Sequence, residues 1–151
     1  MSICDDLELF PVLARTPSGV TSLMFQASSG ILTLRLGYGS PDEDLDEEPW
    51  IALAVDVGTG HSSGAPTTVM TADGSFPGSF DARQVDQPGI DDPREASFAY
   101  WTAEGLAITA SALDVSRAAF DEAIAELRLV DRASFLDYQE QAELRSEVLC
   151  T

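Results

Sequence analysis

The chain has 151 residues, and we expect residues 1–151 to form a single domain with a core of its own. It carries 26 Asp and Glu against eight basic residues, all of them Arg, so its formal net charge is −18. A charge of this sign and size repels nucleic acid and anionic membranes, which argues against direct binding to either. The same charge attracts basic protein surfaces and speeds encounter with them.

The N-terminal segment, residues 3–14, mixes apolar and acidic side chains, and Pro11 interrupts any helix there. We expect a short helix or an irregular arm that packs at its apolar positions. No basic and apolar leader opens the chain, which argues against a signal peptide. Cys4 and Cys150 are isolated and lack metal-site spacing, which is typical of a reducing cytoplasm, although a disulfide between them stays open.

Three strands are expected next, over residues 20–27, 31–38 and 50–57. Residues 28–30 form a short loop that ends in Gly, which indicates a hairpin between the first two. The second and third strands alternate apolar and smaller or polar residues, the pattern of a sheet with one buried face. The apolar positions are Leu32, Leu34, Leu36 and Tyr38 in the second strand and Ile51, Leu53, Val55 and Val57 in the third. The sequence thus predicts an antiparallel meander.

The middle of the chain has weaker patterns. Residues 67–72 are rich in β-branched side chains and predict a fourth strand. Residues 75–93 are rich in Gly, Pro and Asp and show little periodicity, so we expect a long loop there. The side chains that would hold this loop to the body of the domain are Phe76, Phe80, Val85 and Ile90. A loop of this length in a compact domain is unusual, and it is either functional or mobile.

The C-terminal third predicts a second hairpin and then helices. Residues 97–102 and 106–112 read as strands around Ala103-Glu104-Gly105. Beyond it, Asp114 or Ser116 is placed to cap a helix, and Asp131 or Ser134 a second one, with a single bent helix as the alternative. The apolar stripe of the first helix is Phe120, Ala123, Ile124 and Leu127. The expected fold is α+β, an antiparallel sheet of about five to six strands with the C-terminal helices packed on one face.

An acidic run lies between Pro41 and Pro49, where six of the seven residues are carboxylates. It matches a calcium loop at its first Asp positions, but the sharp turn that needs Gly has Glu47 and the bidentate position has Leu53. We therefore predict no EF-hand. A solvated hairpin loop, a weak divalent-cation site and a docking surface for a basic partner remain as interpretations. The six carboxylates are Asp42, Glu43, Asp44, Asp46, Glu47 and Glu48.

A second motif begins at Asp56, in the run Val55-Asp56-Val57-Gly58-Thr59-Gly60. It resembles the Asp-x-Gly-Thr phosphate loop of the actin and sugar-kinase superfamily, whose fold needs far more chain. It also resembles the Asp-Thr/Ser-Gly triplet of aspartic proteases, but Val57 stands where that family has a hydroxyl. His61, the sole histidine, lies in a Gly- and Ser-rich loop, and no nucleophile elbow accompanies it. The alternative function from these residues is a carboxylate-dependent hydrolase built around Asp56.

The main functional expectation is a small acidic protein, not an enzyme, that binds and neutralises or escorts a basic protein. A toxin-immunity inhibitor leads, with a secretion chaperone or a DNA mimic as variants, so the partner is a toxin or a nucleic-acid-binding protein. The aromatic hairpin followed by an acidic helix resembles, in outline, the small acidic α+β chaperones of bacterial secretion systems. We expect the acidic run to steer the partner and exposed aromatic residues to anchor it, namely Trp50, Tyr100 and Trp101. No cofactor and no metal are expected.

Overall fold

The computed structural model describes residues 7–28, 31–38, 49–56, 64–85 and 94–141. Its main element is a seven-stranded antiparallel sheet with the strand order β2-β3-β4-β8-β7-β6-β5. The strands are β2 (Ser22–Ser28), β3 (Ile31–Gly37), β4 (Trp50–Asp56), β5 (Ala65–Thr71), β6 (Gly74–Val85), β7 (Arg94–Ala103) and β8 (Leu106–Leu113). The fold is broadly α+β, as predicted, but the main sheet has more strands than the five to six expected.

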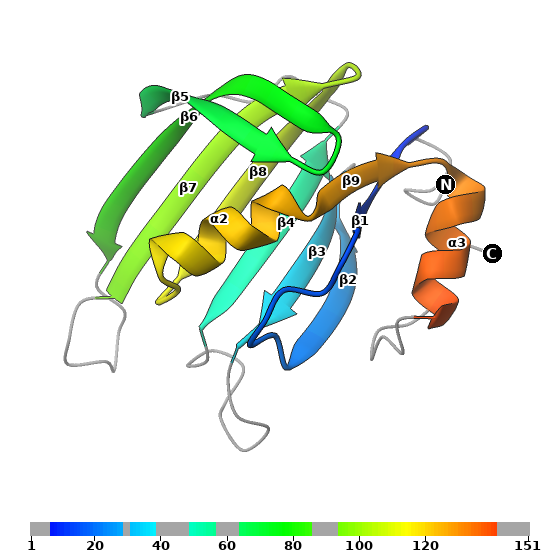
Figure 1. Cartoon of the computed structure of the whole chain (residues 1–151), viewed down its shortest axis with the longest axis horizontal. Helices are drawn as coiled ribbons and strands as arrows, with labels where there is room; N and C mark the ends of the chain where they lie inside the picture. Colours follow the sequence, from blue (N-terminus) through cyan, green and yellow to red (C-terminus); the bar gives the residue numbers. More distant parts are fainter. Residues whose placement is uncertain (1–6, 29–30, 39–48, 57–63, 86–93, 142–151) are drawn as a thin grey trace.

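Two helices and two short strands complete the described fold. Helix α2 (Arg117–Ala125) crosses one face of the main sheet (Figure 1) and contacts β4 and β5. Strand β9 (Leu127–Val130) follows it and pairs antiparallel with β1 (Phe10–Leu13). Helix α3 (Arg132–Gln141) comes last and packs against β1. Within the described residues, neither helix has the length and apolar character needed to cross a bilayer.

The core lies between the main sheet and the layer formed by α2, β9 and β1. The alternating apolar residues of β3 and β4 point into it, and all six have no exposed surface: Leu32, Leu34, Leu36, Ile51, Leu53 and Val55. This confirms the predicted meander, because alternate residues of a strand share one face. Leu34 pairs with Leu53 and Leu53 with Ala110, so the same buried layer continues onto β8.

The long loop predicted for residues 75–93 is wrong for its first half, which is strand β6. The Gly and Pro content hid this strand, because its regularity comes from pairing with both neighbours and not from composition. Pro77 lies where β6 pairs with β5 alone, a place where a missing N–H is tolerated. Gly78 is required by close approach, since a Cβ there would lie 2.3 Å from the carbonyl oxygen of Tyr100. Residues 86–93 lie outside the described ranges.

The N-terminal arm and the segment after α2 also differ from expectation. Residues 10–13 are a buried strand, not a helix or irregular arm, and they pair with β9. Leu127, predicted to continue the helix stripe, is buried as expected but begins β9. Both strands have four residues, too few for a period to be read from sequence.

The helix signals were more reliable. The Ser116 hydroxyl accepts a hydrogen bond from the Ala119 N–H and caps α2. Phe120, Ala123 and Ile124 of the predicted stripe are buried. At α3, the Asp131 carboxylate accepts from the Ser134 N–H at 2.9 Å, so Asp131 is the cap and two separate helices are confirmed. The β7–β8 turn is two residues, Glu104 and Gly105, both with positive φ as a type I′ hairpin requires.

Candidate functional site

The acidic loop joins two paired strands. Its six carboxylates, at 42–44 and 46–48, lie outside the described residues, but both of its ends are described. Strand β3 ends at Gly37 and β4 begins at Trp50, and these residues are register partners. The Tyr38 N–H donates to the Pro49 carbonyl at 2.9 Å and closes the base of the loop. The described residues on either side of the run, Tyr38 and Pro49, are therefore held together at one end of the β3–β4 pair.

Of the three predicted aromatic anchors, two share one face of the main sheet. Trp50 and Tyr100 are half-buried on the face opposite α2, since their alternating neighbours point into the core. The guanidinium of Arg35 lies 5.3 Å from the centre of the Trp50 ring. Trp101 is 1% exposed and points into the core beside Ile108. Trp101 therefore lacks the exposure that an anchor for a partner needs, which leaves Trp50 and Tyr100 as the aromatic candidates.

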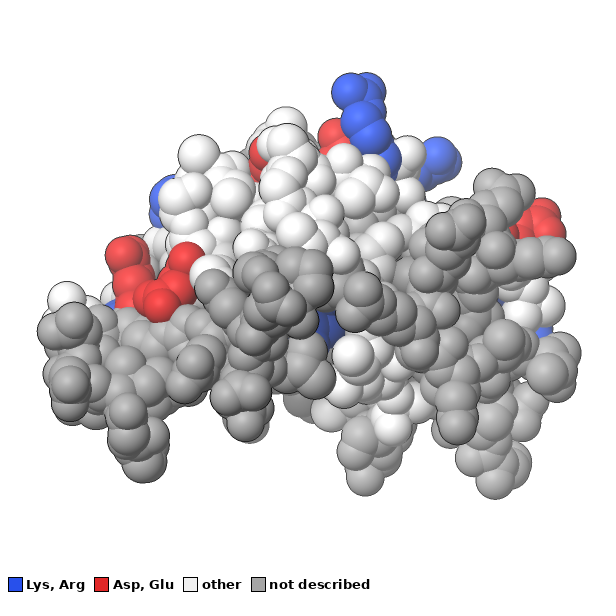
Figure 2. Space-filling view, turned by 90° about the horizontal axis from the view of Figure 1, so that it is seen from below, with Lys and Arg blue, Asp and Glu red and all other residues white. Residues whose placement is uncertain are grey.

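Several arginines are engaged within the chain. Arg83 pairs with Asp81 at 2.9 Å, Arg117 with Asp121 at 3.0 Å, and Arg128 lies 3.7 Å from Asp73. All are largely exposed, so each pair contributes little to stability. Each pair joins one cation to one acid, so it is locally neutral and leaves the net charge of the chain unchanged. Figure 2 shows one side of the molecule, on which the described Asp and Glu residues are spread over separate places and not gathered into one patch.

Asp56 ends β4 on the sheet face opposite α2. It is half-buried and pairs in register with Ala107 and Ile31. Val57, Gly58, Thr59 and Gly60, which would complete either motif, lie outside the described residues, as does His61. The two cavities described next are not lined by Asp56. Neither of these cavities therefore supports the Asp56 hypothesis.

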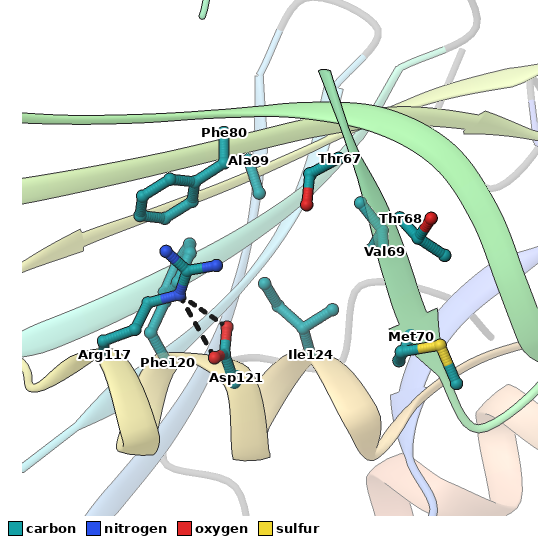
Figure 3. A pocket seen from close by; sticks show the side chains of 10 residues that line it. All are labelled: Thr67, Thr68, Val69, Met70, Phe80, Ala99, Arg117, Phe120, Asp121 and Ile124. Carbon is teal, nitrogen blue, oxygen red and sulfur yellow. Dashed lines mark hydrogen bonds and ion pairs between the residues drawn. The ribbon is translucent and has the colours of Figure 1, made fainter. Parts of the chain in front are cut away.

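A cavity of about 200 Å³ opens between β5 and α2 (Figure 3). Its apolar wall comes from β6, β7 and α2, and the Arg117–Asp121 pair lies at the helix side. The Arg117 guanidinium lies 3.6 Å from the centre of the Phe80 ring. The lining residues are Thr67, Thr68, Val69, Met70, Phe80, Ala99, Arg117, Phe120, Asp121 and Ile124. A second cavity, of about 10 Å³, is too small for a ligand.

The sequence did not point to this cavity. Its residues come from four elements and carry no metal-site or nucleophile motif. One signal was available, since residues 65–71 include no charged residue in a chain of charge −18. Within the described ranges, no group of three or more His, Cys, Asp or Glu side chains is arranged to hold a metal ion.

Comparison with known proteins gives no relative. No family model, no curated protein sequence and no solved structure matches the chain.

Proposed function

We propose that the chain is a small acidic protein, not an enzyme, that binds and then neutralises or escorts a basic protein. The observation that carries the proposal is the formal net charge of −18. The field around the molecule is therefore strongly negative, and such fields raise the rate of encounter with basic partners.

The partner surface includes the acidic loop at residues 42–48, with Trp50 close to its base. The exposed helix acids Asp121, Glu122 and Asp137 add to the negative field of the molecule, although α2 lies on the sheet face opposite Trp50. Tyr100 shares the sheet face of Trp50 and is the second aromatic candidate. Exposed charges act mainly on the association rate, whereas aromatic residues that become desolvated supply affinity.

Three variants of this function differ in the partner. A toxin-immunity protein binds and blocks a toxin, a secretion chaperone escorts a protein before export, and a DNA mimic occupies a nucleic-acid site. Competition tests the last variant, because a DNA mimic must be displaced from its partner by double-stranded DNA. The products of neighbouring genes separate the first two, since a toxin gene beside this one indicates immunity.

The experiment is capture of partners from the native organism on the immobilised chain, at low and at high salt. We expect one or a few basic proteins that bind at low salt and are released at high salt. Salt weakens the attraction between exposed charges, and at 0.1 M it largely screens those more than about 10 Å apart. Capture of no basic protein at low salt, or capture that salt does not weaken, contradicts the proposal.

A further inference from the structure

Strand β5 is an open edge of the main sheet. Among the described residues it pairs on one side only, with β6. Proteins usually protect such edges with charged residues, prolines or bulges, because unpaired backbone groups invite another strand. Strand β5 reads Ala-Pro-Thr-Thr-Val-Met-Thr, with no charge, and Pro66 is its one protective residue. Met70 on the same strand is 60% exposed.

The hairpin register shows which backbone groups point outward. The β5–β6 turn has two residues, so the closing pair, Thr71 and Gly74, exchanges backbone hydrogen bonds. Bonded and non-bonded pairs alternate along an antiparallel ladder. The Thr68–Pro77 pair is therefore non-bonded, which agrees with the missing N–H of Pro77. The N–H and C=O groups of Thr68 and Met70 thus point away from β6, toward the open edge.

The cavity lies along this same edge. Consecutive residues of a strand point to opposite faces, so a cavity beneath the sheet would touch only alternate residues. Here four consecutive residues of β5, from Thr67 to Met70, line it. The cavity therefore reaches the backbone edge of β5 and continues under the sheet to Phe80, Ala99 and α2. At the other end of β5, the Ala72 N–H already donates to the Leu127 carbonyl, which limits pairing to the part before it.

The size of the cavity favours one side chain over a free small molecule. Small-molecule sites usually enclose about 300–1,000 Å³, and this cavity holds about 200 Å³. An apolar cavity of about 150 Å³ takes a benzene-sized group. A single Phe or Leu side chain therefore fits it.

Charge favours a basic segment over a second copy of this chain. Helix α2 carries Asp121 at the cavity, Glu122 on its exposed surface and Glu126 at its C-cap, against the single Arg117. Two copies of a chain of charge −18 repel each other, whereas a segment with Lys or Arg is attracted.

We propose that an extended segment of the partner pairs with β5 as an added strand and places one large apolar side chain in the cavity between β5 and α2. This inference rests on the proposed function, which supplies the basic character of the segment. Backbone pairing provides part of the affinity, and the cavity provides the preference for a large apolar residue.

The probe is a fluorescein-labelled peptide, Arg-Arg-Thr-Val-Phe-Val-Thr-Arg-Arg, with binding followed by fluorescence anisotropy. We expect the wild-type chain to bind it, and to bind the peptide with Ala in place of Phe at least about tenfold more weakly. Equal binding of the two peptides, or no binding of either, overturns the proposal.

Thr68→Pro removes the outward N–H of the edge while leaving the bonded pairs with β6 intact, as Pro66 does two residues earlier. The matched control is Ala27→Pro on β2, the other edge of the sheet. The register pairs Ser28 with Ile31 at the end of the β2–β3 ladder, and alternation from that pair places Ala27 in the same outward orientation. We expect T68P to weaken peptide binding at least about tenfold and A27P to leave it unchanged. Equal effects of the two variants overturn the proposal.

Two further arms separate the causes of failure. The first arm uses a peptide with Glu in place of every Arg. If it binds as well as the basic peptide and its binding still depends on Thr68 and Phe, the β5 groove is supported and the proposed basic partner is contradicted. If binding depends on Arg but not on Thr68 or Phe, the basic partner is supported and the groove is contradicted. Sedimentation equilibrium tests the second copy: a dimer that T68P abolishes overturns the proposal in favour of self-pairing.

Discussion

The centre of the main sheet and its β5 edge are built from the same antiparallel pairing but are packed differently. At the centre, strand β4 lies beside β8 and buries Ile51, Leu53 and Val55 with no exposed surface. At the edge, β5 and β6 offer Thr, Gly and Pro, and the space between β5 and α2 is left as a cavity of about 200 Å³. The difference indicates that the centre serves the fold, whereas the edge has room for an interaction that the fold itself does not need.

The largest expected effect is at the centre. Leu53→Ala removes a side chain that lies fully buried between Leu34 and Ala110. We expect a loss of about 2–5 kcal/mol in the free energy of unfolding, because the tightly paired strands cannot collapse into the space left behind. Urea denaturation measures it. A loss below about 1 kcal/mol would mean that the centre is as loosely packed as the edge.

Two alanines that are register partners compare the regions directly. Ala110 is fully buried at the centre, and its partner Ala99 lines the cavity. We expect Ala110→Leu to cost about 1–3 kcal/mol by overpacking, whereas Ala99→Leu fits the cavity and costs less. Thermal unfolding of both variants checks the order. If A99L destabilises as much as A110L, the cavity is not open space.

The wall of the cavity depends on the cap of α2. Ser116→Ala removes the hydroxyl that accepts from the Ala119 N–H, so we expect a loss of about 1 kcal/mol in the free energy of unfolding. Ser116→Gly, the matched variant, should cost only a few tenths. Equal losses for the two variants would contradict a capping role.

The pH dependence of stability tests the burial of Tyr38, which follows β3 and is influenced by the charge of Glu122 on α2. Burial, aided by the charge of Glu122, raises the pKa of Tyr38 to about 12, and the described residues offer its buried hydroxyl no hydrogen-bond partner. An unfolded Tyr ionises near pH 10, so the folded state holds the proton more tightly. This contribution to stability is complete below about pH 10 and is lost as the pH rises toward 12.

Tyr38→Phe should therefore reduce the loss of stability between pH 10 and 12, measured by urea denaturation at each pH. Burial also raises the pKa of Tyr138, so the double variant with Tyr138→Phe should flatten the profile further. A profile unchanged by Tyr38→Phe would place the alkaline sensitivity elsewhere.

The parts of this fold that the sequence predicts are those whose local patterns are strong. The strands at 31–37 and 50–56 carry signals within a few residues and were predicted to within one residue at their ends. The cap at Ser116 is one of the two that the sequence offered for the first helix, the other being Asp114. Strand β6 was missed because Pro77 and Gly78 suit a loop by composition, and only β5 and β7 make them a strand. The same limit applies to the site. Burial of Trp101 and the cavity between β5 and α2 depend on which distant elements meet, and no local motif records that.

The central claim is that the negative field, with the acidic loop as part of it, steers a basic partner. Two loop acids, Glu47 and Glu48, are changed to Gln in one variant. The matched variant changes Glu8 and Glu104, which are exposed, so that both variants lose the same charge. Glu8 is remote from the loop in sequence, and Glu104 lies in the β7–β8 turn, at the opposite end of the sheet from Trp50.

The decisive measurement is the association rate of the captured partner as a function of ionic strength, by stopped-flow. We predict that the loop variant associates about three- to tenfold more slowly at low salt and with a flatter salt dependence, and that the remote variant changes less. Equal rates for the wild type and the loop variant at low salt would contradict the claim.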